Sequence, residues 1–235
     1  MKQLIIASTS TLHSGQYLDY LLDDLKIHFK NIDDIVFIPY ARPSGITHDE
    51  YTKKAAKAFA KIGITVKGLH EFKNPVEAIT NAKGIFTGGG NTFVLVNALY
   101  KFKLINPLKA AVKNGIPYLG TSAGSNICGL TMCTTNDMPI VYPPSFKTLS
   151  FVPFNINPHY LDPDPSSKHM GETRETRIKE FHKFNTQPVV GLREGSWLEV
   201  KGQSIQLKGV LNARVFEHGS EPYEIETYTF LNELK

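Results

Sequence analysis

The feature that most constrains the fold is a regular alternation of short apolar runs and amphipathic stretches through the first half of the chain. The runs at residues 4–8 and 35–39 are continuously apolar rather than alternating, so each predicted strand must be covered on both faces. Continuously apolar strands separated by helices are typical of parallel sheets. The sequence therefore predicts an α/β fold, a doubly wound, mostly parallel sheet with helices on both faces.

The predicted strands of this half cover residues 4–8, 35–39, 64–69, 84–87 and 116–119. The predicted helices cover residues 18–29, 51–62, 75–82 and 92–102, with Gly63 ending the second, and a last helix before Gly115. That last helix is expected to have Asn106 as its N-cap and Pro107 in its first turn.

The chain beyond residue 130 is richer in turns. We expect short strands at 149–154 and 189–192, a charged helix at 171–184 with Ile178, Phe181 and Phe184 facing inward, a hairpin at 197–208, and closing edge strands at 215–228. Because there is no linker, repeat or low-complexity segment, residues 1–235 are interpreted as one domain.

Composition excludes several classes of function. The net charge of +4 comes from 26 basic and 22 acidic residues without a basic block, so no nucleic-acid partner is expected. Cys128 and Cys133 have no second cysteine pair, which argues against zinc and favours buried free thiols. No apolar run is long enough to cross a membrane. We expect a cytoplasmic protein without cofactor or metal, and the oligomeric state stays open, with a homodimer as one option.

A G-x-S-x-G motif follows the predicted strand at 116–119 and precedes small residues that can open a helix: Gly120-Thr121-Ser122-Ala123-Gly124. A strand, a tight turn and a helix are the context of a nucleophile elbow, in which the turn exposes the serine hydroxyl. The motif therefore predicts Ser122 as a nucleophile, and a plain glycine-rich turn is the alternative.

A serine nucleophile needs a base, because a hydroxyl is weakly nucleophilic at neutral pH. His159 is the best candidate, since it follows Asn157-Pro158 and proline restrains the preceding backbone. An exposed loop histidine is the alternative interpretation, and His169 is the reserve candidate.

The base needs an acid that holds its tautomer, and two carboxylates stand in suitable contexts. Asp137 lies in a polar turn at 134–139, where it could equally be an Asx-turn residue. Glu194 ends a buried strand, where it could equally be an exposed charge. The residues alone do not separate the two.

A second glycine-rich loop follows the predicted strand at 84–87: Gly88-Gly89-Gly90. It could hold a phosphate or supply N–H groups to an oxyanion, or it could be only a flexible turn. The loop lacks the spacing of the known phosphate-binding motifs, so we favour the oxyanion role.

The chain resembles peptidase E, the α-aspartyl dipeptidase family of serine peptidases, over nearly its whole length. Six motifs in the same order carry the resemblance, at residues 88–93, 120–124, 134–141, 156–159, 171–175 and 191–195. The resemblance implies metal-independent hydrolysis of dipeptides that begin with aspartate, and a fold similar to class I glutamine amidotransferases.

The resemblance also implies roles for individual residues. Ser122 would be the nucleophile and His159 the base, with Asp137 or Glu194 as the third member of the triad. The N–H groups of Gly88 and Ala123 would form the oxyanion hole. Arg174 would bind the aspartyl carboxylate of the substrate, for which a planar guanidinium is suited, although a solvated helix arginine is the alternative.

One departure and two rival functions remain. A proline-rich loop at 162–167 separates His159 from the motif at 171–175 and could alter the mouth of the site. A cyanophycinase-like exopeptidase would share the elbow but cut β-linked aspartyl-arginine, whereas the short chain and Arg174 favour the dipeptidase. A non-catalytic binding protein of this fold would not need the full set of catalytic side chains. The expected partner is thus a small Asp-X peptide.

Overall fold

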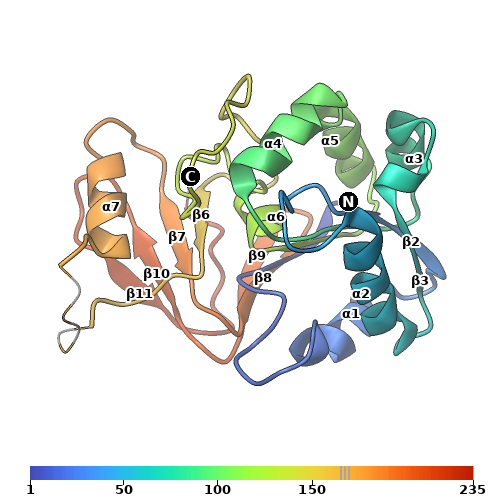
Figure 1. Ribbon diagram of the computed structural model, residues 1–235. Helices are drawn as coiled ribbons and strands as arrows, with labels where there is room; N and C mark the ends of the chain where they lie inside the picture. Colours follow the sequence, from blue (N-terminus) through green and yellow to red (C-terminus); the bar gives the residue numbers. More distant parts are fainter. Residues whose placement is uncertain (165, 167, 169, 235) are drawn as a thin grey trace.

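The computed structural model describes residues 1–164, 166, 168 and 170–234. Its larger sheet has the strand order β3-β2-β4-β5-β1-β8-β9 (Figure 1). The first five strands in this order run parallel, whereas β8 and β9 continue the sheet in antiparallel pairing. The strands are β1 (Gln3–Ala7), β2 (Asp34–Ile38), β3 (Thr65–Gly68), β4 (Ile85–Thr87), β5 (Tyr118–Thr121), β8 (Ser196–Lys201) and β9 (Ser204–Gly209).

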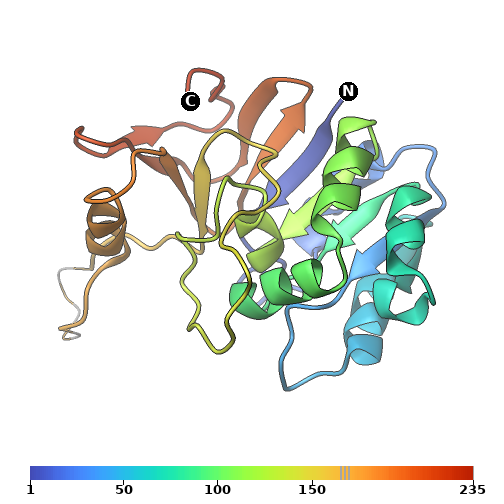
Figure 2. The same cartoon turned by 90° about the horizontal axis from the view of Figure 1, so that it is seen from above.

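Helices cover both faces of this sheet, as the sequence predicts (Figures 1 and 2). One face packs Ile5, Phe37 and Phe86 against the two helices α1 (Leu22–His28) and α2 (His48–Ala60). The other face packs against four helices, α3 (Pro75–Thr80), α4 (Thr92–Lys101), α5 (Ile105–Lys113) and α6 (Ala123–Asn126). Short 3-10 turns lie at Asp19–Leu21 and Leu69–Glu71. The apolar runs are therefore buried on both sides, which explains why they do not alternate.

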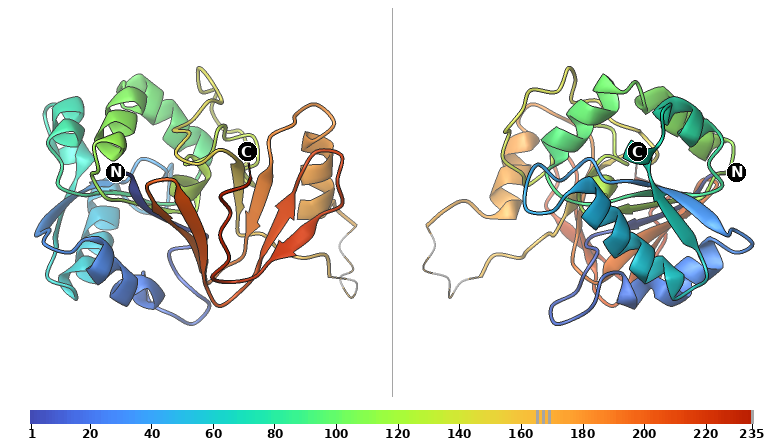
Figure 3. Two further views of the ribbon diagram at one scale, coloured as in Figure 1. Left: turned by 180° about the vertical axis from the view of Figure 1, so that it is seen from behind. Right: turned by 45° about the vertical axis from the view of Figure 1, so that its right-hand side comes forward.

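A second, four-stranded sheet that the sequence analysis did not predict stands beside the first, in the order β11-β10-β7-β6 (Figure 3). Its strands are β6 (Asn155–Pro158), β7 (Val189–Leu192), β10 (Ala213–Phe216) and β11 (Tyr223–Ile225). Helix α7 (Arg174–Phe181) covers it through Ile178, which packs with Tyr160, Val189 and Phe216. The chain crosses from β7 to β8 through residues 193–195, so the two sheets meet at this point.

Several details differ from the predictions. Helix α5 begins at Ile105 with Leu104 as an N-cap that makes no side-chain bond, so Asn106 is not the cap. Pro107 is tolerated there because the first N–H groups of a helix have no intrahelical acceptor. Phe184 is 93% exposed and follows the end of α7, and Cys133 is exposed whereas Cys128 is buried.

Residues 149–154 were predicted as a strand, but they wrap around the end of α6. The N–H groups of Leu149 and Phe151 donate to the carbonyls of Ile127 and Cys128, so they are not available to a neighbouring strand. Ser150 has a φ of 52°, which breaks an extended conformation. The strand begins only at Asn155, after Pro153.

Candidate active site

Ser122 lies on the sharp turn between β5 and α6, with φ 55° and ψ −113°. This positive φ is unusual for a residue with a side chain, and the N–H of Ser122 is held by the Ala7 carbonyl at 3.2 Å. The turn has no room for larger neighbours. A Cβ on Gly89 would lie 2.7 Å from the Ser122 Cβ, and one on Gly120 would lie 2.8 Å from the Gly124 carbonyl carbon. The motif glycines therefore serve the close approach that an elbow requires.

A chain of two hydrogen bonds leads away from Ser122. His159 Nε2 lies 2.8 Å from Ser122 Oγ, and His159 Nδ1 lies 2.6 Å from Glu194 Oε1. The imidazole and the carboxylate are partly exposed, at 33% and 45%, so a substrate can reach the serine from solvent. Ser122 comes from the larger sheet, whereas His159 follows β6 of the smaller sheet.

Ser8 joins the two sheets directly beneath this constellation. Its fully buried hydroxyl donates to the Leu192 carbonyl at 2.6 Å and accepts the His159 N–H at 2.9 Å. Ser8 follows β1, so it ties a central strand of the larger sheet to the backbone of His159 and to the end of β7. Sequence reasoning missed this residue, although a small polar residue directly after a buried central strand was a signal for it.

Asp137 has a different environment. Its Oδ2 accepts hydrogen bonds from the Thr92 N–H and hydroxyl, both at 2.7 Å, and from the Thr135 hydroxyl at 3.0 Å. Thr92 is the first residue of α4, so the Asp137 charge stabilises the positive end of that helix. Among the described residues, the carboxylate that the structure brings to His159 is that of Glu194.

In the glycine loop after β4, some N–H groups already donate to acceptors within the protein and others do not. The Gly88 N–H donates to the Ile38 carbonyl at 3.2 Å, so the expectation that it faces a substrate is not met in this arrangement. The Gly89 N–H donates to the Tyr51 hydroxyl at 2.9 Å. In the described part of the chain, the N–H groups of Gly90 and Ala123 have no hydrogen-bond acceptor. The sequence predicts the loop Gly88-Gly89-Gly90 as a source of oxyanion N–H groups, but not the hydrogen bonds between Gly89 and Tyr51.

Arg174 is the first residue of α7, and no carboxylate of the described residues lies within ion-pair distance of it. Burial lowers the pKa of its guanidinium, and the Arg177 charge adds to this effect, whereas Asp137 opposes it. Arg174 lines a pocket of about 360 Å³ together with Arg177, and with residues 161–164 and 171–173. An unpaired, partly buried cation of this kind can accept a carboxylate from a ligand.

Comparisons with known proteins identify the family of the chain. The model of "Peptidase family S51" matches residues 4–208. This chain belongs to peptidase family S51. "Peptidase E" of Streptomyces coelicolor is 48% identical over 231 residues, which are 98% of this chain and 94% of that protein. The "Probable alpha-aspartyl dipeptidase" of Drosophila melanogaster is 45% identical over 219 residues, 92% of this chain and 90% of the relative.

Solved structures show the same fold at lower identity. A peptidase from an acI-B1 Actinobacterium has a TM-score of 0.74 at 16% identity, covering 98% of this chain and 96% of its own. A "Putative Peptidase E Protein" from Listeria monocytogenes has a TM-score of 0.69 at 19% identity, covering 90% of this chain and 100% of its own. These likenesses confirm the predicted α/β fold, and they are consistent with its expected similarity to class I glutamine amidotransferases.

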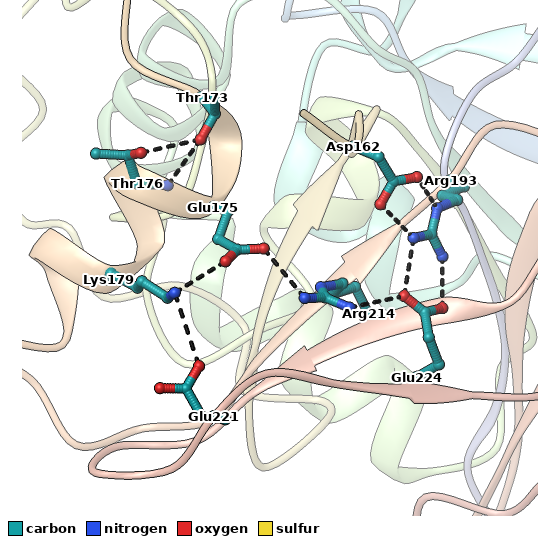
Figure 4. Close-up of polar contacts among 9 residues, drawn as sticks. All are labelled: Asp162, Thr173, Glu175, Thr176, Lys179, Arg193, Arg214, Glu221 and Glu224. Carbon is teal, nitrogen blue, oxygen red and sulfur yellow. Dashed lines mark hydrogen bonds and ion pairs between the residues drawn. The ribbon is translucent and has the colours of Figure 1, made fainter. Parts of the chain in front are cut away.

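In this S51 peptidase, an ion-pair network surrounds Arg193, which follows β7 (Figure 4). Glu194 is the next residue along the chain. The preceding residue, Arg193, pairs through a planar fork with Asp162 and also binds Glu224 of β11, with distances of 2.5 to 2.9 Å. Its guanidinium lies 5.5 Å from the centre of the Tyr160 ring. The hydrogen bonds to Glu224 and Asp162 raise the pKa of Arg193, and Arg193 in turn holds the pKa values of both carboxyl groups below their usual range.

The network continues from β11 to α7. Arg214 of β10 pairs with Glu224 at 3.3 Å and with Glu175 of α7 at 3.2 Å, and Glu175 also pairs with Lys179 at 2.9 Å (Figure 4). The helix that begins with Arg174 is thus linked by charge to the strand end beside Glu194. Multiple bidentate contacts make such a network more rigid than isolated surface pairs.

Some predicted residues of this S51 peptidase lie outside the part of the chain that the structure describes. His169 and positions 165 and 167 of the proline-rich loop lie outside the described residues. In the part of the chain that the structure describes, no three His, Cys, Asp or Glu side chains come together as a metal site. Within the same residues, none of the helices has the length and apolar character needed to cross a bilayer.

Proposed function

We propose that this protein is a serine dipeptidase that hydrolyses dipeptides with an N-terminal aspartate. The observation that carries the proposal is the hydrogen-bonded chain from Ser122 through His159 to Glu194, together with Arg174, which has no ion-pair partner among the described residues. The family membership and the relative named as a probable alpha-aspartyl dipeptidase support the same reaction.

In the proposed mechanism, His159 Nε2 accepts the Ser122 proton as the oxygen attacks the peptide carbonyl. The carboxylate of Glu194 stabilises the imidazolium that forms and holds its tautomer through Nδ1. His159 then protonates the leaving amine, which leaves an acyl-serine intermediate. Water repeats the sequence with the same base and releases aspartate.

The developing oxyanion needs donors on the opposite side of the carbonyl from His159. We assign this role to the Ala123 N–H at the start of α6, which has no acceptor among the described residues. For the second donor we assign the Gly90 N–H in place of Gly88, because the Gly88 N–H is engaged by Ile38. The Tyr51–Gly89 hydrogen bonds would hold the loop in place for this task.

Arg174 would select the substrate by pairing with the side-chain carboxylate of its first residue. An Asp side chain brings a charge at the right distance, Glu brings it one methylene too far, and Asn brings none. We therefore expect efficient cleavage of Asp-Leu, weak cleavage of Glu-Leu and almost none of Asn-Leu. The substitution Arg174→Met should lower kcat/KM for Asp-Leu about a hundredfold, as for loss of a charged hydrogen bond of about 3 kcal/mol.

Lys183→Met is the control, because Lys183 is an exposed cation just after α7 that does not line this pocket. Both variants should still react with a fluorophosphonate at Ser122, which separates substrate choice from the chemistry. Normal Asp-Leu cleavage by Arg174→Met would contradict the assignment. Preferred cleavage of β-Asp-Arg by the parent protein would instead favour a cyanophycinase-like activity.

We also place the protein in the cytoplasm as part of this proposal. Cys128 and Cys133 are both free thiols, which suits a reducing compartment. Fractionation of the source cells with an antibody against the protein tests this location, and recovery with secreted proteins would contradict it.

A further inference from the structure

A cavity of about 680 Å³ lies outside the candidate active site, and none of Ser122, His159, Glu194 or Arg174 lines it. It lies between the loop after β2, the 3-10 turn after β3 and one face of α4. A volume of this size suits an organic ligand rather than a simple ion. It is also larger than the pocket beside Arg174.

The charged side chains that line this cavity are cationic. Its lining includes the cations Arg42, Lys73 and Lys101 and the imidazoles His48 and His70, but no carboxylate. Asp49 bonds to His70 Nε2 at 2.7 Å but is not one of the lining residues. Like charges gathered in one concavity repel one another unless an anion joins them, so the lining favours an anionic ligand.

Two buried nitrogen atoms of the lining lack hydrogen-bond partners among the described residues. They are Arg42 Nε and His70 Nδ1. A buried polar atom without a partner costs free energy that a ligand or water can recover. Arg42 is also held over the Tyr51 ring, with its guanidinium carbon 4.9 Å from the ring centre, so its position is set before a ligand arrives.

Several aromatic side chains also line the cavity. Tyr40 packs against Phe102 at 5.2 Å and against His48 at 5.4 Å between ring centres, and His48 lies 5.4 Å from His70. Phe72 and Pro75 add apolar surface. Such surfaces bind planar aromatic bodies by stacking and burial of apolar area.

We propose that this cavity is a second binding site, for a small molecule that joins a planar aromatic ring to a phosphate or carboxylate group. The anion would pair with Arg42 and the two lysines, and the ring would pack against Tyr40 and Phe102. The site borders the catalytic loop, because Tyr51 beneath Arg42 exchanges hydrogen bonds with Gly89.

Isothermal titration of the full chain carrying Ser122→Ala tests the proposal with four probes. These are 1-naphthyl phosphate, 1-naphthoate, neutral 1-naphthol and inorganic phosphate. We expect at least one naphthyl anion to bind with a Kd below about 1 mM, and at least tenfold more tightly than naphthol and inorganic phosphate. The ratio between the two naphthyl anions then tells which anionic group the site prefers.

Substitutions locate the binding. Lys73→Met combined with Lys101→Met should weaken the tighter naphthyl anion at least tenfold, whereas the matched pair of Lys26→Met in α1 and Lys30→Met just after it should not. Arg42→Gln, checked for folding by circular dichroism, should weaken it as well. Binding that is not saturable, that is unchanged by the Lys73 and Lys101 substitutions, or that is lost in Arg174→Met would overturn the proposal.

Discussion

Ser122 and His159, whose side chains lie 2.8 Å apart, both have positive backbone φ angles, of 55° and 54°. Such conformations cost about 1–3 kcal/mol each for residues with side chains, so the surrounding structure must hold them. The Ser122 N–H donates to the Ala7 carbonyl and the His159 N–H donates to the Ser8 hydroxyl, and these two bonds supply that restraint. The strain is thus concentrated at the two residues whose side chains meet.

This strain predicts that glycine at position 122 gives a more stable protein than alanine does, although both substitutions abolish most of the activity. Ser122→Gly should raise the free energy of unfolding by about 1 kcal/mol relative to Ser122→Ala, because glycine adopts positive φ without a steric penalty. Both variants should lose several orders of magnitude in kcat on Asp-Leu. Urea unfolding measures the first effect and a dipeptide assay the second. A glycine variant less stable than the alanine variant would show that the turn is not strained.

Ser8 is predicted to be required for activity although it is buried and has no contact with Ser122 among the described hydrogen bonds. Ser8→Ala leaves the Leu192 carbonyl and the His159 N–H without their partner, which should cost about 1–3 kcal/mol of stability. We expect kcat to fall at least tenfold, because His159 loses its backbone anchor. The control is Ser10→Ala, two residues further along. Equal kcat values for the two variants would rule out this role.

Glu194 and Asp137 are predicted to separate by the kind of defect each substitution causes. Glu194→Gln should lower kcat strongly with little change in stability, since it removes the charge that stabilises the imidazolium. Asp137→Asn should mainly lower stability, since it weakens the bonds to Thr92 at the start of α4. Kinetics and thermal unfolding of both variants decide this. A larger kcat loss in Asp137→Asn would reverse the assignment.

The Arg193 network predicts a loss of stability in acid. Asp162 and Glu224 have folded-state pKa values below their unfolded ones, so their contribution is present above the unfolded values and is lost as the pH falls through the folded ones. The free energy of unfolding should therefore decline below about pH 4.5. Arg193→Met should be less stable at pH 7, and its difference from the parent should shrink by pH 3.

Urea titrations at pH 7, 5, 4 and 3 check this prediction. Arg177→Met is the control, because Arg177 contacts only Glu172, at 3.8 Å, among the described ion pairs. A difference between the parent and Arg193→Met that stays constant with pH would mean that the two carboxylates do not respond to Arg193.

The sequence predicted the larger sheet well because its information is local. The apolar runs and the periodic helices define β1 to β5 and their crossovers without reference to distant residues. The second sheet was missed because β6 follows a turn-rich stretch, and its partner β7 comes about thirty residues later. Pro153 and the bonds that residues 149–151 make to the end of α6 also shifted the predicted strand.

The residues of the candidate site also fall into those that local sequence patterns predict and those that they do not. Ser122 and His159 could be singled out by the local signals of an elbow and a restrained loop, and the structure brings them together. Asp137 and Glu194 could not be ranked, because both lie in suitable local contexts and only the crossing between the sheets decides which one reaches His159. The oxyanion donors depend on whether an N–H is already bonded in the sheet, which no local pattern reveals at Gly88.

Ser122 follows a strand of the larger sheet, whereas His159 follows the edge strand of the smaller sheet. The proposed site is therefore assembled from both sheets. Neither sheet carries all of the proposed catalytic groups, so the activity should report the docking of the two sheets as well as their folding. A local opening of the smaller sheet would silence the serine while leaving the larger sheet folded, since regions of a domain can open independently. A split of the gene near residue 145 would leave Ser122 on one fragment, and His159, Glu194 and strands β8 and β9 of the larger sheet on the other, so that the reunion of the two fragments could be read out as peptide hydrolysis.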